Sequence, residues 1–418
     1  MAQLSDDCFA HGGQLMTTDE ALARLADRVV TVSVPEEVSL RAGHGRILAA
    51  DLVATRDVPA HDNAAVDGYA IFFADLDPAG DTRLPVTGTA AAGHPLGRAA
   101  GPGEAIRIFT GAPMPDGPDT VMMQEDCRRQ DGEVVIRPGI RRGANRRDAG
   151  EDVAAGTTVL RRGHRLRPQD LGMAASLGLT RLTVYARLRV ALLSTGDEIR
   201  EPGAALPPGC IYDSNRVTLH TALEGLGCTV TDLGIVPDRL DAVRRTLADA
   251  ADGHDLIVSS GGVSVGEEDH VRAAVEALGS LHFWRLAIKP GRPFAMGQVG
   301  RIPFIGLPGN PVAVMVTFLR FARPLILRLA GASDLTPVLF RVRAGFDHKK
   351  KPNRREFIRA RLVAAEDGEL VADKFPRAGA GIRSSLVEAH GLVELPEEVT
   401  ELAAGTMVDF LPFNEVWR

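Results

Sequence analysis

The chain has 418 residues, of which 45% are hydrophobic and 24% are charged, and we expect a globular protein of about two to four domains. Its formal net charge is −6 and its basic residues are dispersed, which disfavours general nucleic-acid binding. The cysteines lack zinc or disulfide spacing, and no apolar segment is long enough to span a membrane, so we expect a cytoplasmic protein.

The first predicted element is a helix over 17–29. Thr17 and Glu20 form a capping-box pattern ahead of apolar residues at helical spacing. From Val53 to Val159 the composition changes to frequent glycine and proline with short apolar runs, which is typical of β structure. We therefore predict an inserted, β-rich domain over 57–152.

Alternating strands and helices follow over 187–332. The predicted strands are the apolar runs 190–194, 228–235, 255–260 and 302–307. The predicted helices start near Asp213, Asp241, Asp269 and Asn310. This order predicts an α/β domain with a doubly wound, mostly parallel sheet, and alternating runs over 333–418 predict a C-terminal β domain. The fold class is therefore multidomain α/β.

The loops that follow the predicted strands are rich in glycine, proline and small polar residues. They are 194–198, 259–269, 289–293 and 306–311. Ligands bind parallel sheets at the carboxyl ends of the strands, so we expect these loops to line one cleft.

The segment 255–275 carries the strongest chemical pattern. Glycines and serines follow a buried strand there and suit an anion, because backbone N–H groups and hydroxyls point at it; these are Ser260, Gly261, Gly262, Ser264 and Gly266. Acidic residues, among them Asp269, follow at once. Acids beside an anion cradle indicate a divalent cation between them, so we predict a metal-assisted phosphate site.

Two further carboxylates follow predicted strands. Glu198, in the first exit loop, is positioned to hold a metal ion or orient water, although an acid at such a place also forms turns. We favour a functional role for Glu198. Asp238 follows another strand and is equally consistent with a metal ligand and with a turn residue before a helix.

Lys289 lies beside Pro290 and Arg292 in a turn flanked by apolar residues. Such a lysine suits an oxyanion, and the alternative is a surface charge on a turn. Asn310, followed by proline, is predicted to cap a helix, and this explanation suffices structurally although a helix start also attracts anions.

Three more polar residues have both structural and functional interpretations. Asp67, before a glycine, is either a turn former or a catalytic carboxylate. Thr110 and Asp152 are likewise a turn hydroxyl and a turn carboxylate, or parts of a site.

Six motifs together resemble one family, the molybdopterin molybdenumtransferases or molybdenum insertases, which include the C-terminal domain of gephyrin. The motifs span nearly the whole chain in the family's order: 58-VPAHDNAAVDGYA-70, 104-EAIRIFTGAPMP-115, 194-STGDE-198, 259-SSGGVSVGEED-269, 288-IKPGRPFA-295 and 306-GLPGNPV-312. A single motif of this kind can arise by chance, whereas six in the same order and approximate spacing are highly specific.

The resemblance implies a homodimer whose elongated subunit includes a linking and dimerisation domain formed by 1–56 and 153–186. It implies a cleft shared between the α/β domain of one subunit and the Asp67 region of the other. The substrates would be adenylylated molybdopterin and molybdate, with cleavage of a pyrophosphate, dependent on Mg²⁺ or another divalent cation, and release of AMP. The partners would be the molybdopterin adenylyltransferase that delivers the substrate and recipient molybdoenzymes or their chaperones.

The resemblance also implies roles for individual residues. Glu198, Asp238 and Asp269 would bind metal and phosphate, and Lys289 would bind the oxyanion. The inserted domain would contribute Asp67, Thr110, Arg147 and Asp152. The remaining substrate-binding residues would be those of the glycine–serine loop together with Arg285, Pro290, Arg292, Pro308, Gly309, Asn310, one of Arg355 and Arg359, and one of Ser384 and Ser385.

The chain departs from the family pattern at five positions. These are Ala64 and Val66 in the first motif, Arg285 where lysine is frequent, Ala313 where serine is frequent and His390 where asparagine is common. None of them removes a carboxylate, so we expect an active enzyme. The alternatives are a catalytically silent scaffold of the same fold and another phosphate-handling enzyme.

Overall fold

The computed structural model describes residues 15–262, 270–291 and 293–416. The chain separates into two compact units. Unit 1 contains the residues up to Ala50, 162–167 and those from Leu182 onward, and unit 2 contains Asp51–Arg161 and Pro168–Arg181. Each unit has its own sheets and its own buried core, so each is described by itself.

The core of unit 1 is a six-stranded sheet in the order β16-β13-β17-β21-β20-β18. Its strands are β13 (Arg189–Thr195), β16 (Thr229–Val236), β17 (Leu256–Ser260), β18 (Gly279–Arg285), β20 (Pro293–Val299) and β21 (Ile302–Leu307). Strands β16, β13, β17 and β21 are parallel, as predicted, whereas β20 is antiparallel to both neighbours. The antiparallel strand was not predicted, because periodicity does not encode strand direction.

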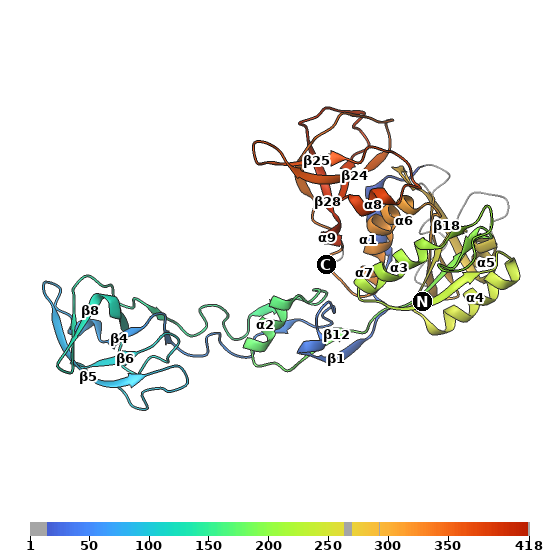
Figure 1. The fold of residues 1–418 in the computed structure, drawn as a ribbon. Coiled ribbons are helices and arrows are strands. Elements are labelled where there is room, and N and C mark those ends of the chain that lie inside the picture. Colours follow the sequence, from blue (N-terminus) through green and yellow to red (C-terminus); the bar gives the residue numbers. More distant parts are fainter. Residues whose placement is uncertain (1–14, 263–269, 292, 417–418) are drawn as a thin grey trace. The chain divides into compact units, whose positions relative to one another are not determined.

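Helices cover both faces of this sheet (Figure 1). One face packs against α3 (Ser214–Gly225), α6 (Pro311–Thr317) and α7 (Arg323–Leu329), and the other against α4 (Leu240–Gly253) and α5 (His270–Leu278). Successive β13 side chains alternate between the two faces: Leu192 lies in the α3 cluster and Leu193 in the α4 cluster. The doubly wound prediction is therefore confirmed.

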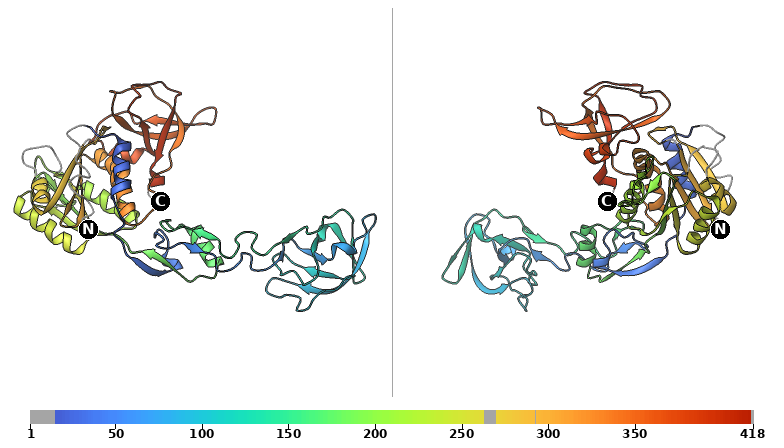
Figure 2. Two further views of the ribbon diagram at one scale, coloured as in Figure 1. Left: turned by 180° about the vertical axis from the view of Figure 1, so that it is seen from behind. Right: turned by 45° about the vertical axis from the view of Figure 1, so that its right-hand side comes forward.

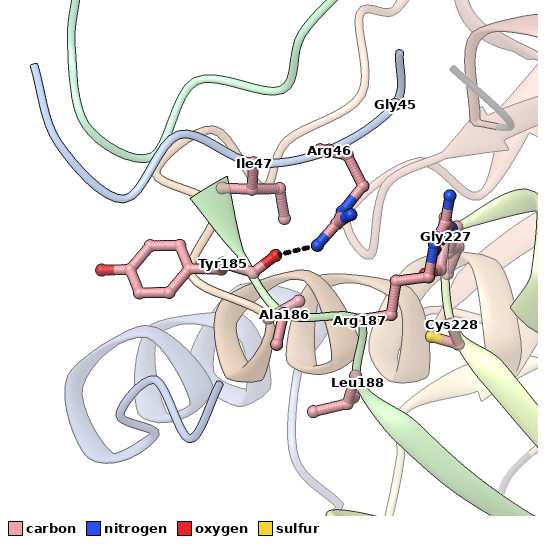
Figure 3. Close-up of a pocket in the computed structure, with 11 residues that line it drawn as sticks. Gly45, Arg46, Ile47, Tyr185, Ala186, Arg187, Leu188, Gly227 and Cys228 are labelled. Atoms are coloured by element: carbon pink, nitrogen blue, oxygen red, sulfur yellow. Dashed lines mark hydrogen bonds between the residues drawn. The ribbon is translucent and has the colours of Figure 1, made fainter. Parts of the chain in front are cut away.

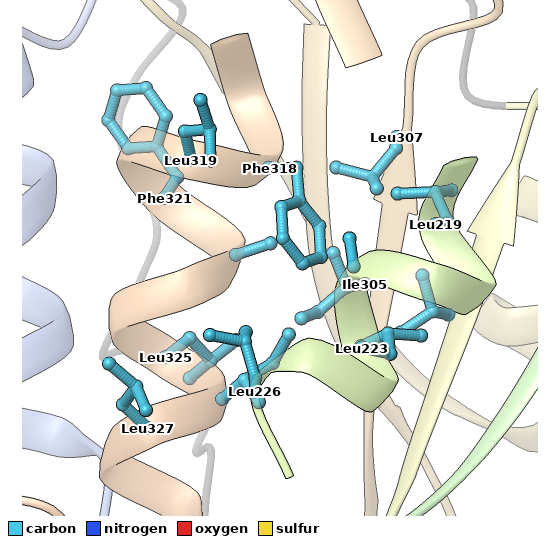
Figure 4. Packing of buried hydrophobic residues seen from close by; sticks show 14 of the residues in the cluster. Leu219, Leu223, Leu226, Ile305, Leu307, Phe318, Leu319, Phe321, Leu325 and Leu327 are labelled. Atoms are coloured by element: carbon cyan, nitrogen blue, oxygen red, sulfur yellow. The ribbon is translucent and has the colours of Figure 1, made fainter. Parts of the chain in front are cut away.

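The first of these faces is densely apolar. Figure 4 shows Leu219 and Leu223 of α3 packed toward Ile305 of β21 and Phe318. Burying a side chain of this size stabilises the fold by about 1.5–3 kcal/mol. This cluster therefore packs the middle and C-terminal turns of α3 against the sheet.

The apolar run 311–329 is a continuous helical stretch in which the π-helix η5 (Phe318–Ala322) joins α6 to α7. Two of its arginines are buried with partners: Arg320 lies 3.2 Å from Glu394, and Arg323 donates to the Val416 carbonyl at 2.8 Å. Within the described part of the chain, no helix has the length and apolar character needed to cross a bilayer.

The C-terminal domain, red in Figure 2, is a second six-stranded sheet of unit 1, in the order β19-β24-β25-β22-β28-β26. An additional pairing between β24 and β26 curls it into a barrel-like form. Its elements are β19 (Ile288–Lys289), β22 (Phe340–Ala344), β23 (His348–Lys349), β24 (Arg355–Ala364), β25 (Leu370–Lys374), α8 (Ser384–Glu388), β26 (Gly391–Leu395), β27 (Glu401–Leu402), β28 (Met407–Pro412) and α9 (Phe413–Val416). The predicted C-terminal β structure is confirmed.

The rest of unit 1 begins with helix α1 (Thr18–Arg28). The predicted capping box is present, because the Thr17 backbone N donates to Glu20 Oε2 at 2.9 Å and the Glu20 backbone N donates to Thr17 Oγ1 at 3.3 Å. The other short elements are β1 (Pro35–Ser39), η2 (Leu40–Ala42), β12 (Arg181–Tyr185), β14 (Ile199–Arg200) and β15 (Ile211–Tyr212).

Unit 2 contains a third six-stranded sheet, in the order β7-β4-β6-β5-β9-β8. Its elements are β2 (Leu52–Val53), β3 (Asn63–Ala64), β4 (Gly68–Ile71), η3 (Phe73–Asp75), β5 (Thr82–Ala90), β6 (Ala105–Ile108), β7 (Thr120–Met123), η4 (Gln124–Asp126), β8 (Cys127–Gln130), β9 (Glu133–Ile136), β10 (Arg146–Arg147), β11 (Thr158–Leu160) and α2 (Pro168–Ser176). The β-rich character predicted for this region is confirmed.

Candidate functional site

The carboxyl ends of the parallel strands meet at one edge of the central sheet. Ser194 of β13 is in register with Ser260 of β17, and Ser260 with Leu307 of β21. Thr195 is in register with Val236 of β16. The loops after these four strands therefore leave the sheet together, as the sequence predicted.

The loop 289–293 reaches the same edge by a different route. It was predicted to follow a strand of the parallel sheet, but it enters the antiparallel strand β20. Because Ala295 is in register with Gly306, the start of β20 lies beside the carboxyl end of β21. The loop thus lies at the expected edge but enters a strand of this sheet rather than leaving one, and the single cleft lined by these loops stays a prediction.

Thr195 lies at the centre of this edge. Its Oγ1 donates to Asp238 Oδ1 at 3.3 Å. The first two glycines of the predicted cradle pack directly on it: a Cβ at Gly261 would lie 2.8 Å from the Thr195 carbonyl oxygen, and one at Gly262 2.9 Å from its methyl group. Both glycines have positive φ angles, so only glycine permits this close approach of the two loops.

Glu198 folds back over the same turn. A Cβ at Gly196 would lie 2.6 Å from Glu198 Oε2, so the carboxylate lies against the turn that follows β13. Glu198 is exposed and Asp238 is half-buried, and together they flank the consecutive residues Thr195 and Gly196. Both are therefore accessible to a ligand at the sheet edge.

These carboxylates suit a hard cation better than a transition metal. Mg²⁺ is commonly held by one or two carboxylates, with water and substrate phosphate completing its shell. In the described ranges, no group of three or more His, Cys, Asp and Glu side chains gathers as a self-sufficient metal site. The donor set therefore fits a cation that arrives with a phosphate substrate. Asp269, the third predicted metal ligand, lies outside the described residues.

Helix α3 contributes contacts to this edge that sequence reasoning missed. Asp213 caps the helix by accepting from the Arg216 backbone N at 3.1 Å, and the Asn215 amide donates to the Gly309 carbonyl at 2.7 Å. Ser194, on the α3 side of β13, is 1% exposed, and its Oγ has no hydrogen-bond partner among the described atoms. No periodicity marks Asn215, because its contact joins distant segments of the chain.

Helix α6 begins at Pro311, as predicted from the sequence. Asn310 occupies the N-cap position but makes no side-chain capping bond. Gly309 and Asn310 are exposed, whereas Pro308 is buried. The turn therefore presents its glycine and asparagine to the same edge.

Lys289 lies where the central sheet meets the C-terminal domain. It belongs to β19, which pairs in parallel with β24 so that Lys289 is in register with Glu356. Its Nζ lies 3.3 Å from Glu356 Oε2, and its side chain is 48% exposed. The turn after it is tightly packed, because a Cβ at Gly291 would lie 2.9 Å from the Thr317 methyl group. Pro290, the predicted substrate-binding residue between them, is half-buried.

Glu356 is a buried carboxylate with several cationic partners. Arg354 Nη2 donates to its Oε1 at 2.8 Å, and His348 Nε2 lies 3.0 Å from its Oε2. Burial opposes ionisation of Glu356, but the His348 hydrogen bond and the Lys289 charge outweigh it and lower its pKa. Sequence reasoning missed Glu356, although it stands between two candidate arginines.

The structure separates the two arginine candidates. Arg355 is held by three carboxylates, Asp19, Glu394 and Glu397. Arg359 is buried, and its Nε donates to Ser385 Oγ at 3.0 Å. Ser385 is fully buried and Ser384 is exposed. Arg359 and Ser385 therefore form a direct pair.

In unit 2, Asp67 and Thr110 are in direct contact. The Thr110 backbone N and its Oγ1 each donate to Asp67 Oδ1 at 2.7 Å. These hydrogen bonds lower the pKa of Asp67, with a smaller contribution from the charge of Arg107. Arg107 stacks on the Phe109 ring at 4.7 Å and donates to Gln124 Oε1 at 2.6 Å. Asp67 is thus held as an ionised carboxylate at one end of β4.

The other two unit 2 candidates lie apart from this pair in the sequence, Arg147 in β10 and Asp152 in the loop that follows it. Arg147, in β10, is in register with Asn63, and its Nε lies 3.8 Å from Glu151. Asp152 is exposed, and its backbone N donates to the Val58 carbonyl at 3.1 Å. These contacts are compatible with a structural role and leave both side chains accessible.

Several predicted residues cannot be placed. Ser264, Gly266, Asp269 and Arg292 lie outside the described residues, as does the side chain of Arg285. Of the other departures from the family pattern, Ala64 is fully buried, Ala313 packs beside Gly291, and His390 Nδ1 accepts from the Leu362 backbone N at 3.1 Å.

Unit 1 also contains a small pocket lined by Gly45, Arg46, Ile47, Tyr185, Ala186, Arg187, Leu188, Leu226, Gly227, Cys228 and Ala330 (Figure 3). Its free volume of about 20 Å³ suits a water molecule. Arg46 spans it and donates to the Tyr185 carbonyl at 2.7 Å. None of the predicted site residues lines it, so this pocket is separate from the candidate site.

Three family profiles match the chain. They are described as "MoeA N-terminal region (domain I and II)" over residues 16–178, "Probable molybdopterin binding domain" over 191–328 and "MoeA C-terminal region (domain IV)" over 341–413. The matches follow the order of the elements described above.

Whole proteins of known type are also similar. The chain is 37% identical over 404 residues to the molybdopterin molybdenumtransferase of Haemophilus influenzae, covering 96% of this chain and 100% of that protein. It is 35% identical over 406 residues to molybdopterin molybdenumtransferase 2 of Mycobacterium tuberculosis, covering 92% and 96%. The crystal structure of a molybdopterin biosynthesis MoeA protein from Pyrococcus horikoshii OT3 superposes with a TM-score of 0.81 at 30% identity, covering 96% of this chain and 100% of that one.

Proposed function

The chain belongs to the molybdopterin molybdenumtransferase family, and we propose that its residues insert molybdate into adenylylated molybdopterin with release of AMP. The observation that carries this proposal is the sheet edge of unit 1. There Glu198 and Asp238 flank Thr195 and Gly196, and the glycine cradle packs on Thr195. Acidic ligands beside an anion cradle suit a phosphoanhydride bound with a cation.

Glu198 and Asp238, with Asp269, are the residues that we assign to a divalent cation, most simply Mg²⁺. When bound, such a cation neutralises charge on the phosphate oxygens as the anhydride breaks. The chain's own contribution is positional. The Thr195 hydroxyl orients Asp238 through its hydrogen bond, and Gly196 lets the Glu198 carboxylate lie against the turn.

The phosphate groups are assigned to the glycine–serine loop and the neighbouring turns. Gly262 offers a backbone N–H and Ser260 a hydroxyl, while the Gly261 backbone N donates to the Leu307 carbonyl at 3.1 Å and so holds this loop beside the turn of Pro308, Gly309 and Asn310. Ser264, Gly266 and Arg292 are assigned here by the family resemblance alone.

Molybdate is a doubly charged oxyanion and needs basic and hydroxyl donors. We assign it to Lys289, with Pro290 shaping the turn, and to Arg359 and Ser385 rather than Arg355 and Ser384. Arg359 donates a hydrogen bond to Ser385, whereas Arg355 already forms ion pairs with three carboxylates. Arg285 is assigned to the same oxyanion because lysine is frequent at its place in the family.

Asp67, Thr110, Arg147 and Asp152 of unit 2 are assigned to the same reaction by the resemblance. The support from structure is strongest for Asp67, whose lowered pKa keeps it ionised and able to accept a hydrogen bond or pair with a cation. We also infer a homodimer, an adenylyltransferase that supplies the substrate and molybdoenzymes that receive the product. The free thiols of Cys127, Cys210 and Cys228 support a cytoplasmic location.

The test is reconstitution with purified full-length protein, adenylylated molybdopterin, molybdate and magnesium. AMP release is followed by chromatography, and product is assayed by activation of an apo-molybdoenzyme. We expect both activities, and their loss on chelation of the cation. A protein that releases no AMP under these conditions is a silent scaffold, and one that cleaves ordinary nucleotides equally well is another phosphate-handling enzyme.

A matched pair of variants tests the site itself. Glu198→Gln keeps the size of the side chain and removes its charge, and AMP release should fall by on the order of 100-fold. Glu224→Gln removes an exposed acid from the far end of α3 and should leave the rate unchanged. Undiminished AMP release in the first variant refutes the role given to Glu198.

A further inference from the structure

A buried carboxylate lies directly behind the exposed Lys289 ammonium group. Glu356 is 2% exposed, and its Oε2 and Oε1 atoms lie 3.3 and 3.4 Å from Lys289 Nζ. The same two oxygens are already engaged, Oε1 by Arg354 and Oε2 by His348. Arg354 and His348 therefore hold Glu356 in place, and Lys289 is the partner that extends toward solvent.

The charges around Glu356 do not cancel. Lys289 and Arg354 are two cations on one carboxylate, and the imidazole of His348 is a third basic partner. One positive charge is left over even with His348 neutral. A group of this composition attracts an oxyanion, whereas a simple one-to-one ion pair would not.

The long contacts between Glu356 and Lys289 also leave the ammonium group able to bind an oxyanion. Charge-assisted N–H···O bonds are usually about 2.7–2.9 Å long, and the Arg354 bond of 2.8 Å fits this range. Lys289 is 3.3 Å away, so it is guided by Glu356 without being saturated. An ammonium group has three donors, which leaves donors available for an incoming ligand.

Contacts on both sides fix the backbone of Lys289, but these contacts do not fix its ammonium group. The Arg355 backbone N donates to the Ala287 carbonyl at 2.8 Å before it, and Gly291 packs on Thr317 after it. A lysine side chain loses about 1.5–2 kcal/mol of rotamer entropy when it is immobilised. A fixed carboxylate that restrains the head group before binding reduces that cost.

We propose that Glu356 is a positioning residue that holds the Lys289 ammonium group in place for the oxyanion substrate. This inference rests on the proposed function, which makes molybdate the oxyanion. Glu356 acts through Lys289 and does not itself touch the substrate, since a carboxylate would repel it. Removing its charge should weaken molybdate binding while leaving the cleavage chemistry at Glu198 intact.

The alternative is that Lys289 and Glu356 form a structural ion pair that joins two domains and has no role in binding. Glu394 provides the matched comparison, because it too is a buried carboxylate of the C-terminal sheet. It lies 3.2 Å from Arg320 and 3.0 Å from Arg355, and it is 5% exposed. A purely structural role for Glu356 predicts that glutamine at either position has the same consequences.

The experiment compares Glu356→Gln with Glu394→Gln in the full-length protein, loaded with adenylylated molybdopterin and magnesium. For Glu356→Gln we expect KM for molybdate to rise on the order of 10-fold while kcat for product formation stays within about twofold. For Glu394→Gln we expect a lower thermal midpoint and an unchanged KM. Equal KM values in the two variants would overturn the inference.

A double-mutant comparison tests that Glu356 acts through Lys289. In a Lys289→Met background, binding of labelled molybdate should not weaken further when Glu356→Gln is added. An undiminished effect in that background contradicts the inference.

If Glu356→Gln does not fold, Glu356→Asp keeps the charge but withdraws it from Lys289, and it should raise the KM for molybdate in the same direction. A wild-type protein without AMP release would defeat the proposed function, whereas an active wild type with unaffected variants would defeat this inference alone.

Discussion

Thr110 donates both its backbone N–H and its hydroxyl to one oxygen of Asp67, at 2.7 Å each, across 43 positions of sequence. Two donors on one carboxylate oxygen favour the ionised form, and the pKa of Asp67 is lowered as a result. The pair therefore acts as one group, in which the threonine sets the protonation state of the aspartate.

Thr110→Val should raise the pKa of Asp67 because it removes the hydroxyl donor and keeps the backbone one. The change is measured directly by NMR titration of the Asp67 carboxyl carbon in the full-length protein. If Asp67 acts as an ionised group, the acid limb of the activity profile moves to higher pH by the same amount. Thr110→Ser keeps the hydroxyl and should leave the titration in place; an identical titration curve in the valine variant contradicts the assignment.

Gly262→Ala should destabilise unit 1 by more than its backbone angle alone explains. The new methyl group would lie 2.4 Å from a Val271 methyl and 2.9 Å from that of Thr195. Overpacking of this kind costs about 1–3 kcal/mol, in addition to about 1 kcal/mol for a side chain at positive φ. Gly300→Ala is the control, since Gly300 also has positive φ and has open space around it. Urea unfolding of both variants measures the difference, and equal losses would contradict the packing argument.

Arg216→Met should cost about 3 kcal/mol at neutral pH, because it leaves the buried Asp213 carboxylate without its cation. The Arg216 guanidinium contacts Asp213 at 3.1 Å, Glu201 at 2.5 Å, and Asp232. Burial opposes ionisation of Asp232, and the hydrogen bond from Arg216 outweighs it and lowers its pKa.

The sign of the pH dependence follows from that loss. Without Arg216 the lowering of the Asp232 pKa is lost and burial acts alone to raise it, so protonation of Asp232 costs the variant less as the pH falls. The gap between wild type and variant in free energy of unfolding should therefore narrow from pH 7 toward about pH 4, near the ordinary aspartate value of 3.8. Arg245→Met removes an exposed arginine 3.4 Å from Asp241 and should cost less than about 0.5 kcal/mol at either pH.

Glu104→Gln should make unit 2 less stable above pH 4.5 and no different from wild type near pH 2. Hydrogen bonds from Arg98, Thr87 and the Gly101 backbone lower the pKa of Glu104 from 4.5 to about 2. A lowered folded-state pKa contributes stability above the unfolded value, and this is lost as the pH falls from 4.5 to 2. The Arg98 side chain is 44% exposed, so solvent screening of this pair limits the contribution to about 1 kcal/mol.

Hydrogen exchange of the β5 and β6 amides in the full-length protein reads out this local stability. Arg98→Gln removes the bidentate partner of Glu104 and should produce the same difference at pH 7. Protection that is equal in wild type and both variants at pH 7 would contradict the prediction.

Several features of the site were predictable because local chemistry determines them. Asp213 and Pro311 mark helix starts by capping preference and fixed φ, and the buried strand 255–260 ends where the glycines begin. Glu198 and Asp238 were expected at strand exits and lie there. The role of Glu356 had no such mark, since a glutamate in an alternating strand is ordinary until its partners are known.

The sequence by itself determined the elements, the fold class and the set of candidate side chains, because hydrophobic period, caps and glycine turns are properties of neighbouring residues. Only the tertiary structure decided which candidates meet. The antiparallel direction of β20, the pairing of Arg359 with Ser385 and the contact of Lys289 with Glu356 depend on strand direction and register between distant segments. Those choices are made by packing the whole sheet, and no local pattern encodes them.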